Sequence, residues 1–134
     1  MPTLEINGKE YIFDESQVID FTEGLVGLPE VRRAALIPLD EFEPFCWLAS
    51  IDDEKSRFVV VDPNVIFPDY DPTESRDIGG PDVEVLTIVK IASDWTNTTV
   101  NLRAPIFIET ATRRGAQHIL STDRYGLAEA IPQG

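Results

Sequence analysis

The chain has 134 residues, 43% of them hydrophobic and 26% charged, and its formal net charge is −13. These proportions are ordinary for a globular protein and argue against a chain that is disordered throughout. A surface this negative repels nucleic-acid phosphates and anionic membranes, so we expect neither direct nucleic-acid binding nor membrane binding. It attracts basic partners and speeds their association, although acidity that serves solubility alone is an open alternative.

Several features predict a cytoplasmic protein. Residues 1–5 lack the basic start and the apolar run of a signal peptide. No stretch approaches the roughly 18 apolar residues that cross a bilayer. The single cysteine, Cys46, cannot form a disulfide within the chain, which fits a reducing compartment.

Short apolar runs separated by turn residues predict strands along most of the chain. Asn7-Gly8 is a strong hairpin signal, because both central positions of its turn need positive φ. It predicts a hairpin between strands at 3–6 and 11–13. Further strands are expected at 18–21, 34–39, 45–51, 57–61, 83–92, 98–102, 105–109 and 117–120.

Helix signals are weak in this sequence. Pro29 to Arg33 could form one turn, since proline is favoured at the first helical position, and residues 72–77 could form another. The proline-rich segment 63–82 is expected to be a long excursion, and residues 122–134 a loosely held tail. The pattern therefore predicts an all-β fold: one small domain over residues 1–134, a closed or partly open antiparallel β-barrel with at most one or two short helical turns.

Few residues in this sequence suit catalysis or metal binding. His118 lies in the predicted strand at 117–120 without an adjacent nucleophile or carboxylate, so it is expected to be an exposed strand residue. Cys46 fits as a small buried hydrophobe and lacks the neighbouring cation that would activate a thiolate. The acidic run 69–74 has Glu74 where a calcium loop needs glycine. We therefore expect no enzyme activity, no metal and no cofactor.

Two surface features are left to explain. The glycine-rich loop from Gly24 to Gly27 has no lysine to hold a phosphate, and it is expected to present Leu25, Val26 and Leu28. Aromatic side chains also fall in predicted loops beside carboxylates or polar residues; they are Phe42, Phe67, Tyr70 and Trp95. Aromatics rimmed by charge are typical of a protein-binding patch, whereas each of them could instead fold back over the core.

Five motifs follow one another along the chain. They are F-x-x-G-L-x-G-L-P at 21–29, the pair Pro38-Leu39 and Pro44-Phe45, F-V-V-V-D-P at 58–63 continuing to F-P-D-Y at 67–70, T-V-N-L-R-A-P-I at 99–106, and Q-x-I-L at 117–120. In this order and spacing they resemble the FliW family. The fourth is the most specific, because it is similar to that family's T-x-N-L-x-A-P-hydrophobic strand. The resemblance covers roughly residues 4–125.

The resemblance implies a compact β-barrel-like domain without catalytic activity. Members of the family bind flagellin, the filament subunit, in the cytoplasm before export. They also bind CsrA, a small basic RNA-binding protein that represses flagellin translation. Flagellin and CsrA thereby compete for the factor, which couples synthesis to secretion. We therefore expect a flagellar assembly factor that binds these two partners and antagonises CsrA.

Two segments are the candidate partner contacts. The first is a loop and the second is a strand edge; their residues are Phe67, Asp69, Tyr70 and Asp71, and Asn101, Leu102 and Arg103. A purely structural role is also open for the second segment, because Asn101 could be a buried amide that joins two strands and Leu102 a core residue.

Two other classes of function are left open by the residues themselves. A small hydrolase or isomerase that uses a carboxylate pair predicts a deep pocket with a carboxyl group of raised pKa. A structural or carbohydrate-binding β-module predicts an exposed aromatic platform on one sheet face. A convex acidic surface would favour the binding protein over both.

Overall fold

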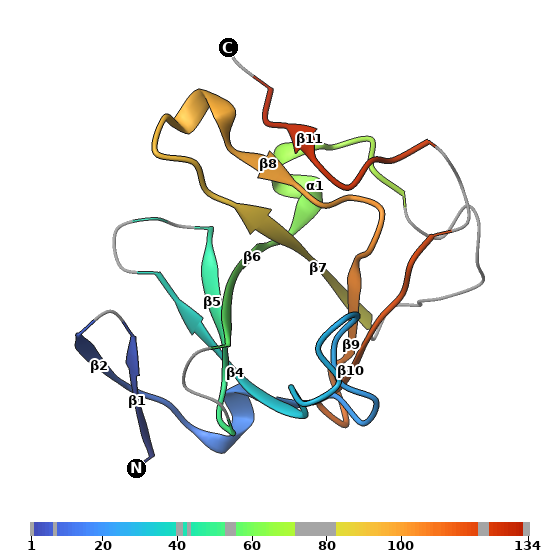
Figure 1. The fold of residues 1–134 in the computed structure, drawn as a ribbon. Coiled ribbons are helices and arrows are strands. Elements are labelled where there is room, and N and C mark those ends of the chain that lie inside the picture. Colours follow the sequence, from blue (N-terminus) through green and yellow to red (C-terminus); the bar gives the residue numbers. More distant parts are fainter. Residues whose placement is uncertain are drawn as a thin grey trace.

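The structure, a computed structural model, describes residues 2–6, 8–39, 42, 44–52, 56–71, 83–120 and 124–132. Figure 1 shows a ring of strands with the β1–β2 hairpin at one end and β8 with β11 at the other. In chain order the elements are β1 (Thr3–Ile6), β2 (Lys9–Ile12), the 3₁₀ turn η1 (Glu15–Gln17), β3 (Val18–Asp20), β4 (Arg33–Pro38), β5 (Cys46–Ser50), β6 (Arg57–Val61), helix α1 (Pro63–Ile66), β7 (Val83–Lys90), the 3₁₀ turn η3 (Trp95–Asn97), β8 (Thr99–Val100), β9 (Ile106–Glu109), β10 (Arg114–Gln117) and β11 (Glu129–Ala130).

Seven strands of the described part of the chain close into a barrel. Neighbours around the ring are β3, β4, β5, β6, β7, β9 and β10, and β10 returns to β3. The pairings around the ring are antiparallel except at this closing seam, where β10 and β3 run parallel and pair at Arg114 and Asp20. The prediction of an all-β barrel is confirmed.

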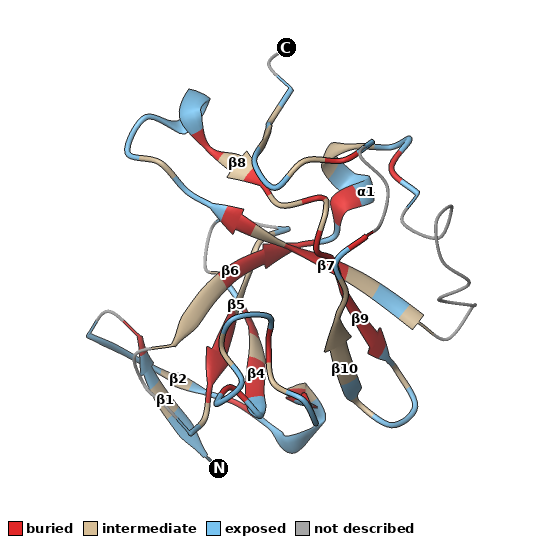
Figure 2. Cartoon of the chain, turned by 45° about the vertical axis from the view of Figure 1, so that its right-hand side comes forward, coloured by how far each residue is buried: buried red, intermediate tan, exposed pale blue. Residues whose placement is uncertain are grey.

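Strand alternation separates an inner core from two outer ones. Leu48 of β5, Val60 of β6 and Ile106 of β9 belong to the inner core and are fully buried. One outer cluster lies beneath the β1–β2 hairpin, and the other lies beneath α1, β8 and the tail. Trp47 on β5 is partly buried and packs against both outer clusters. Figure 2 shows the buried residues concentrated on the ring strands and the hairpin largely exposed.

Short helical turns in the described residues begin at aspartate N-caps. The side chains of Asp14, Asp62 and Asp94 each accept a hydrogen bond from the backbone N–H two residues further on. Pro63 follows Asp62 at the start of α1, where its fixed φ suits a helix. The sequence prediction assigned this segment to a long excursion and missed α1. Among the described residues, no helix is long and apolar enough to span a membrane.

The helical turn predicted at Pro29 to Arg33 does not form. The backbone N–H of Val31 donates to the Leu28 carbonyl in a turn, and Val31 is fully buried. The chain then runs straight into β4, because burying Val31 draws the segment toward the barrel core. That prediction was wrong, and the turn predicted at 72–77 lies outside the described residues.

The segment around His118 also differs from its prediction. The last ring strand is β10, so His118 follows the strand instead of lying within it. His118 is half-buried, with its ring centroid 5.5 Å from that of Phe107. The prediction of an exposed strand histidine was therefore wrong.

The described part of the tail packs on the sheet. β11 pairs with β8, and Tyr125 is 9% exposed. The backbone N–H of Leu102 donates to the carbonyl of Gly126 at 3.1 Å. The contacts differ from the loose tail expected over 122–134, because they depend on strands that are distant in the sequence.

Candidate partner-binding site

The two predicted contact segments lie side by side. The turn after α1 carries Tyr70, and the chain leaving β8 carries Leu102. The Tyr70 hydroxyl donates a 2.6 Å hydrogen bond to the Leu102 carbonyl, and both side chains are buried. This buried bond joins two segments that are 32 residues apart in the sequence.

Tyr125 from the tail closes the other side of Tyr70. The two rings meet edge to face with centroids 4.6 Å apart. The Tyr125 hydroxyl accepts a 3.0 Å hydrogen bond from the backbone N–H of Asp71. Burial, and after it the neighbouring Tyr125, raises the pKa of the Tyr70 phenol. Tyr70 therefore keeps its proton and continues to donate it to Leu102.

A hollow of about 340 Å³ opens beside this tyrosine pair. Four of the predicted contact residues line it, namely Phe67, Asp69, Tyr70 and Leu102, and the tail supplies Arg124 and Glu129. The tail side of this hollow was not predicted as a site. The signal that could have found it is Tyr125, the one aromatic residue among positions 122–134.

Asn101 shapes the backbone that leaves β8. Its Oδ1 accepts hydrogen bonds from the backbone N–H groups of Arg103 at 3.1 Å and Ala104 at 3.0 Å. The side chain thus closes a tight turn. Asn101 and Arg103 are half-buried, whereas Asp69 and Asp71 are exposed. The two aspartates are the predicted contacts most accessible to a partner, and Tyr70 and Leu102 can act only by holding them in place.

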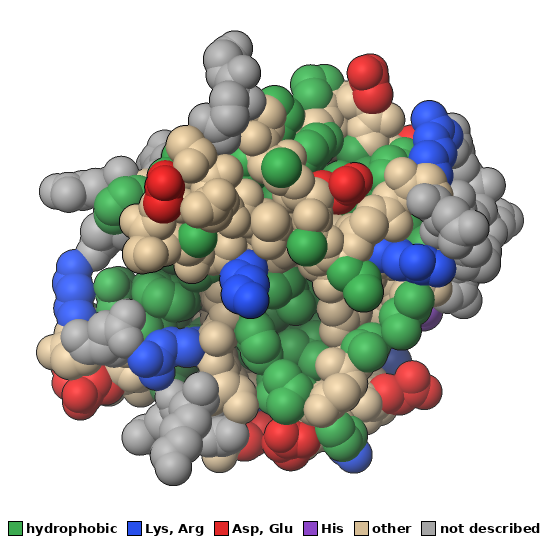
Figure 3. Space-filling model, turned by 45° about the horizontal axis from the view of Figure 1, so that its top comes forward, with side chains coloured by type: hydrophobic (Ala, Val, Ile, Leu, Met, Phe, Trp, Pro, Cys, Tyr) green, Lys and Arg blue, Asp and Glu red, His purple; other side chains and the backbone are tan. Residues whose placement is uncertain are grey.

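A second hollow, of about 200 Å³, lies on the side of the Gly24 loop. Its rim holds the exposed hydrophobics Val26, Ile119 and Leu127. Leu25, by contrast, is 4% exposed, so the prediction that the loop presents it was wrong. Figure 3 shows hydrophobic side chains gathering near the middle of one face, with charged side chains around them.

The Gly24 loop is held in its shape by the backbone. Gly24 has φ +73°, and a Cβ at this position would lie 2.5 Å from the Cα and carbonyl oxygen of Pro29. No side chain fits there, so glycine is required both by its conformation and by the close approach of the chain. The tight loop predicted from the sequence has this physical basis.

The four aromatics predicted in loops differ in how far they are buried. Tyr70 is core and Phe67 is half-buried against it, whereas Phe42 is 63% and Trp95 is 46% exposed. Tyr70 and Phe67 therefore fold back over the core, which was one of the two alternatives. Phe42 and Trp95 are exposed, as the other alternative requires.

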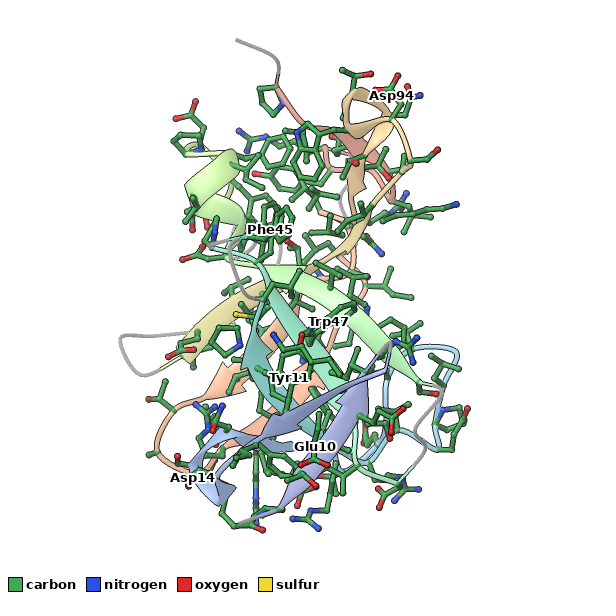
Figure 4. All side chains as sticks on the ribbon, turned by 90° about the vertical axis from the view of Figure 1, so that its left-hand side faces the viewer. Glu10, Tyr11, Asp14, Phe45, Trp47 and Asp94 are labelled. Carbon is green, nitrogen blue, oxygen red and sulfur yellow. The ribbon has the colours of Figure 1, made fainter. Side chains whose placement is uncertain are left out.

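Trp95 belongs to a larger group, the aromatic strip, which we define as Tyr11, Phe45, Trp47 and Trp95. The Phe45 and Trp95 rings meet edge to face with centroids 5.7 Å apart. Phe45 and Trp47 are two positions apart, so they lie on the same outer face of the barrel wall. In Figure 4, Asp94, Phe45, Trp47, Tyr11 and Glu10 follow one another from the top of the view to the bottom.

The titratable groups with shifted pKa values do not resemble catalytic groups. Hydrogen bonds from Ser16 and Thr96 lower the pKa of Asp14 and Asp94, which are exposed, whereas a carboxylate-pair enzyme needs a buried acid of raised pKa. Burial raises the pKa of the Cys46 thiol, the reverse of activation. Within the residues that the structure describes, no group of three His, Cys, Asp or Glu side chains could hold a metal ion.

Comparisons with known proteins agree with the fold and extend it to a family. A family model described as "FliW protein" matches residues 7–131. The flagellar assembly factor FliW of Clostridium beijerinckii is 33% identical over 129 residues, which cover 91% of this chain and 92% of that protein. Its counterpart in Ruminiclostridium cellulolyticum is 37% identical over 132 residues, covering 92% and 88%.

A solved structure is similar over almost the entire chain. The crystal structure of a flagellar assembly factor FliW superimposes with a TM-score of 0.83 at 28% sequence identity, covering 98% of this chain and 99% of that one. The resemblance seen in the sequence motifs is thereby confirmed. Motifs, family model, relatives and fold all agree, and the chain belongs to the FliW family.

Proposed function

We propose that the chain is a non-enzymatic flagellar assembly factor that binds flagellin in the cytoplasm and also binds and antagonises CsrA, relieving repression of flagellin synthesis. The observation that carries the proposal is the match to proteins named as flagellar assembly factors over nearly the whole of both chains. A match of this extent supports a shared role for the entire domain, not for one module within it.

The electrostatics of the chain support a basic partner. A net charge of −13 attracts a basic RNA-binding protein and raises its association rate, and salt screens that attraction. The exposed carboxylates Asp69 and Asp71 contribute to it at the predicted contact segments. The antagonist could cover the RNA-binding groove of CsrA with carboxylates, or bind elsewhere and shift CsrA to a state that does not bind RNA.

Calorimetric titration tests both partner assignments. The purified chain is titrated with flagellin and, separately, with CsrA from the same organism, each at low and high salt. We expect micromolar or tighter affinity for both, and an affinity for CsrA that falls with salt. Folded protein that gives no binding heat with either partner, and no complex in analytical ultracentrifugation, would contradict the proposal.

A competition assay tests the antagonism. Labelled RNA from the flagellin message is bound to CsrA, and its anisotropy is followed as the chain is added. We expect the RNA to be released, and an excess of flagellin to restore its binding by occupying the chain. RNA that stays bound while the chain is bound to CsrA would disprove antagonism and leave binding standing.

A further inference from the structure

The segment from Asn101 to Pro105, which we call the Asn101 turn, connects β8 to β9 (Figure 1). No residue of this turn lies in a strand, since β8 ends at Val100 and β9 begins at Ile106. Its residues are buried or half-buried, so its backbone polar groups need partners within the protein. These partners come from segments that are distant in the sequence.

Backbone groups of the Asn101 turn bond to segments along most of the chain. The Asn101 N–H donates to the Ile88 carbonyl, the Leu102 N–H donates to the Gly126 carbonyl, and the carbonyls of Leu102, Arg103, Ala104 and Pro105 accept from the Tyr70 hydroxyl, the Leu120 N–H, the Gln117 Nε2 and the His118 N–H. The Asn101 side chain fixes the shape of the turn from within, as described above. A turn held in this way cannot shift without disturbing several distant segments.

Gln117 links this turn to the Gly24 loop. Its Nε2 donates to the Ala104 carbonyl at 3.0 Å, and its Oε1 accepts from the Val26 N–H at 2.9 Å. The loop is closed on itself by two backbone hydrogen bonds, 3.1 and 2.9 Å long. It therefore follows the Gln117 side chain as one piece.

The two hollows described above share the Asn101 turn. Leu102 lines the larger hollow together with Tyr70, whose hydroxyl bonds to the Leu102 carbonyl. Asn101 and Ala104 line the smaller hollow together with Val26. Neighbouring residues of one turn thus face different hollows, and bonds that shape either hollow end on the same piece of backbone.

The same bonds join most of the sequence motifs. Tyr70 ends the motif F-P-D-Y, Asn101 and Leu102 belong to T-V-N-L-R-A-P-I, Gln117 begins Q-x-I-L, and Val26 lies in F-x-x-G-L-x-G-L-P. Val26 and Gln117 are 91 positions apart in the sequence. Motifs that are scattered along the chain are therefore parts of one hydrogen-bonded network.

From this arrangement we propose that the Asn101 turn couples the two hollows, so that the Gly24 loop, the Asn101 turn and the turn that carries Tyr70 open and close as one unit. Groups within one hydrogen-bond network depend on one another, and proteins open locally in such cooperative units. A change at either hollow therefore alters the other. The inference goes beyond the proposed function, because it concerns the chain alone and holds whichever partner binds.

Amide hydrogen exchange of the full chain, followed by NMR, tests the coupling without a partner. One reporter is the Val26 N–H, beside the smaller hollow. The other is the Asp71 N–H, which donates to the Tyr125 hydroxyl beside the larger hollow. The variant is Gln117→Met, which removes both bonds of the amide group and keeps the length of the side chain.

Gln17→Met is the matched control. Gln17 is also half-buried, and it bridges two backbone groups in the same way, since it donates to the Leu36 carbonyl and accepts from the Asp14 N–H. The N–H of Leu48, a fully buried residue in the middle of β5, serves as the reference for global unfolding. A reporter that exchanges faster than Leu48 does so by local opening.

We expect Gln117→Met to speed exchange of the Val26 N–H by about fivefold or more, because its acceptor is lost. The Asp71 N–H, whose acceptor is intact, should also exchange faster, by about threefold or more. Tyr70→Phe should give the reciprocal result and speed exchange of the Val26 N–H by a similar factor. Gln17→Met should leave both reporters at their parent rates.

Each other outcome overturns the inference. A faster Val26 N–H in Gln117→Met, with Asp71 at its parent rate, would show that the two hollows open independently. An unchanged Val26 N–H would show that Gln117 does not hold the loop. An equal response of Asp71 to Gln17→Met would indicate general destabilisation, and reporters no faster than Leu48 would leave no local unit. None of these results concerns partner binding, so failure here leaves the proposed function standing.

Discussion

Two aromatic regions on this barrel differ in how far their rings are buried. Beside the larger hollow, Tyr70 and Tyr125 are nearly buried, and both hydroxyls are bonded to backbone groups. In the aromatic strip, Trp95 is 46% exposed and stands beside a charged carboxylate. The tyrosine pair joins distant segments of the chain, whereas the strip leaves its rings accessible. Burial and hydrogen bonding, not residue type, thus distinguish an aromatic that stabilises the fold from one available to a partner.

The largest expected contrast is in stability. Tyr70→Ala removes a buried ring and should lower the free energy of unfolding by about 3–5 kcal/mol. Trp95→Ala removes a ring from the surface and should cost about 1 kcal/mol or less. Urea unfolding of both variants measures the difference. Equal losses would mean that the two regions do not differ as described.

A smaller effect on stability tests the Tyr70 hydroxyl alone. Tyr70→Phe keeps the ring but leaves the buried Leu102 carbonyl without its donor, which should cost about 1–3 kcal/mol. Tyr11→Phe is the matched control in the strip, and its unfolding midpoint should stay within about 0.5 kcal/mol of the parent. A Tyr70→Phe variant as stable as the parent would show that the bond to Leu102 contributes little.

The same phenol predicts a dependence on pH. The pKa of Tyr70 is raised above its ordinary value of 10.0, so the unfolded chain releases this proton before the folded chain does. The resulting stabilisation is complete below pH 10.0 and is lost as the pH rises from there through the folded-state pKa. The free energy of unfolding is measured as the pH is raised from below to above 10.0. It should fall more steeply with pH in the parent than in Tyr70→Phe. Parallel curves would contradict the shift.

The smallest effect concerns the charge beside the strip. Asp94→Asn keeps an acceptor for the Thr96 N–H and removes only the negative charge, so the unfolding midpoint should not change measurably. The association rate of CsrA should fall slightly at low salt and match the parent at high salt. Stopped-flow tryptophan emission measures this rate. An equal reduction at both salts would point to a lost contact instead of a lost charge.

Local signals predicted the elements that depend on neighbouring residues. Asn7-Gly8 predicted the first hairpin, and Gly8 has φ +81° with Ile6 paired to Lys9 across the turn. The β-branched run 57–61 became β6 within its predicted bounds. Asp62 and Pro63 begin α1, within the segment for which the prolines predicted a long excursion.

Features that depend on distant residues could not be predicted in this way. Closure of the barrel requires β10 to return to β3, a pairing between residues 114 and 20 that leaves no pattern in the sequence. The candidate contacts illustrate the same limit. Local sequence placed Tyr70 in an acidic loop, but its burial depends on Leu102 and Tyr125, which lie in other parts of the chain.

The central claim is that burial and hydrogen bonding make the tyrosine pair part of the fold, whereas the aromatic strip stays accessible. Amide hydrogen exchange of the chain tests it most directly, because exposed hairpins and short turns exchange readily. The account predicts slower exchange at 64–71 and 124–130 than at 9–12 and 94–98. Equal exchange in all four segments would contradict it.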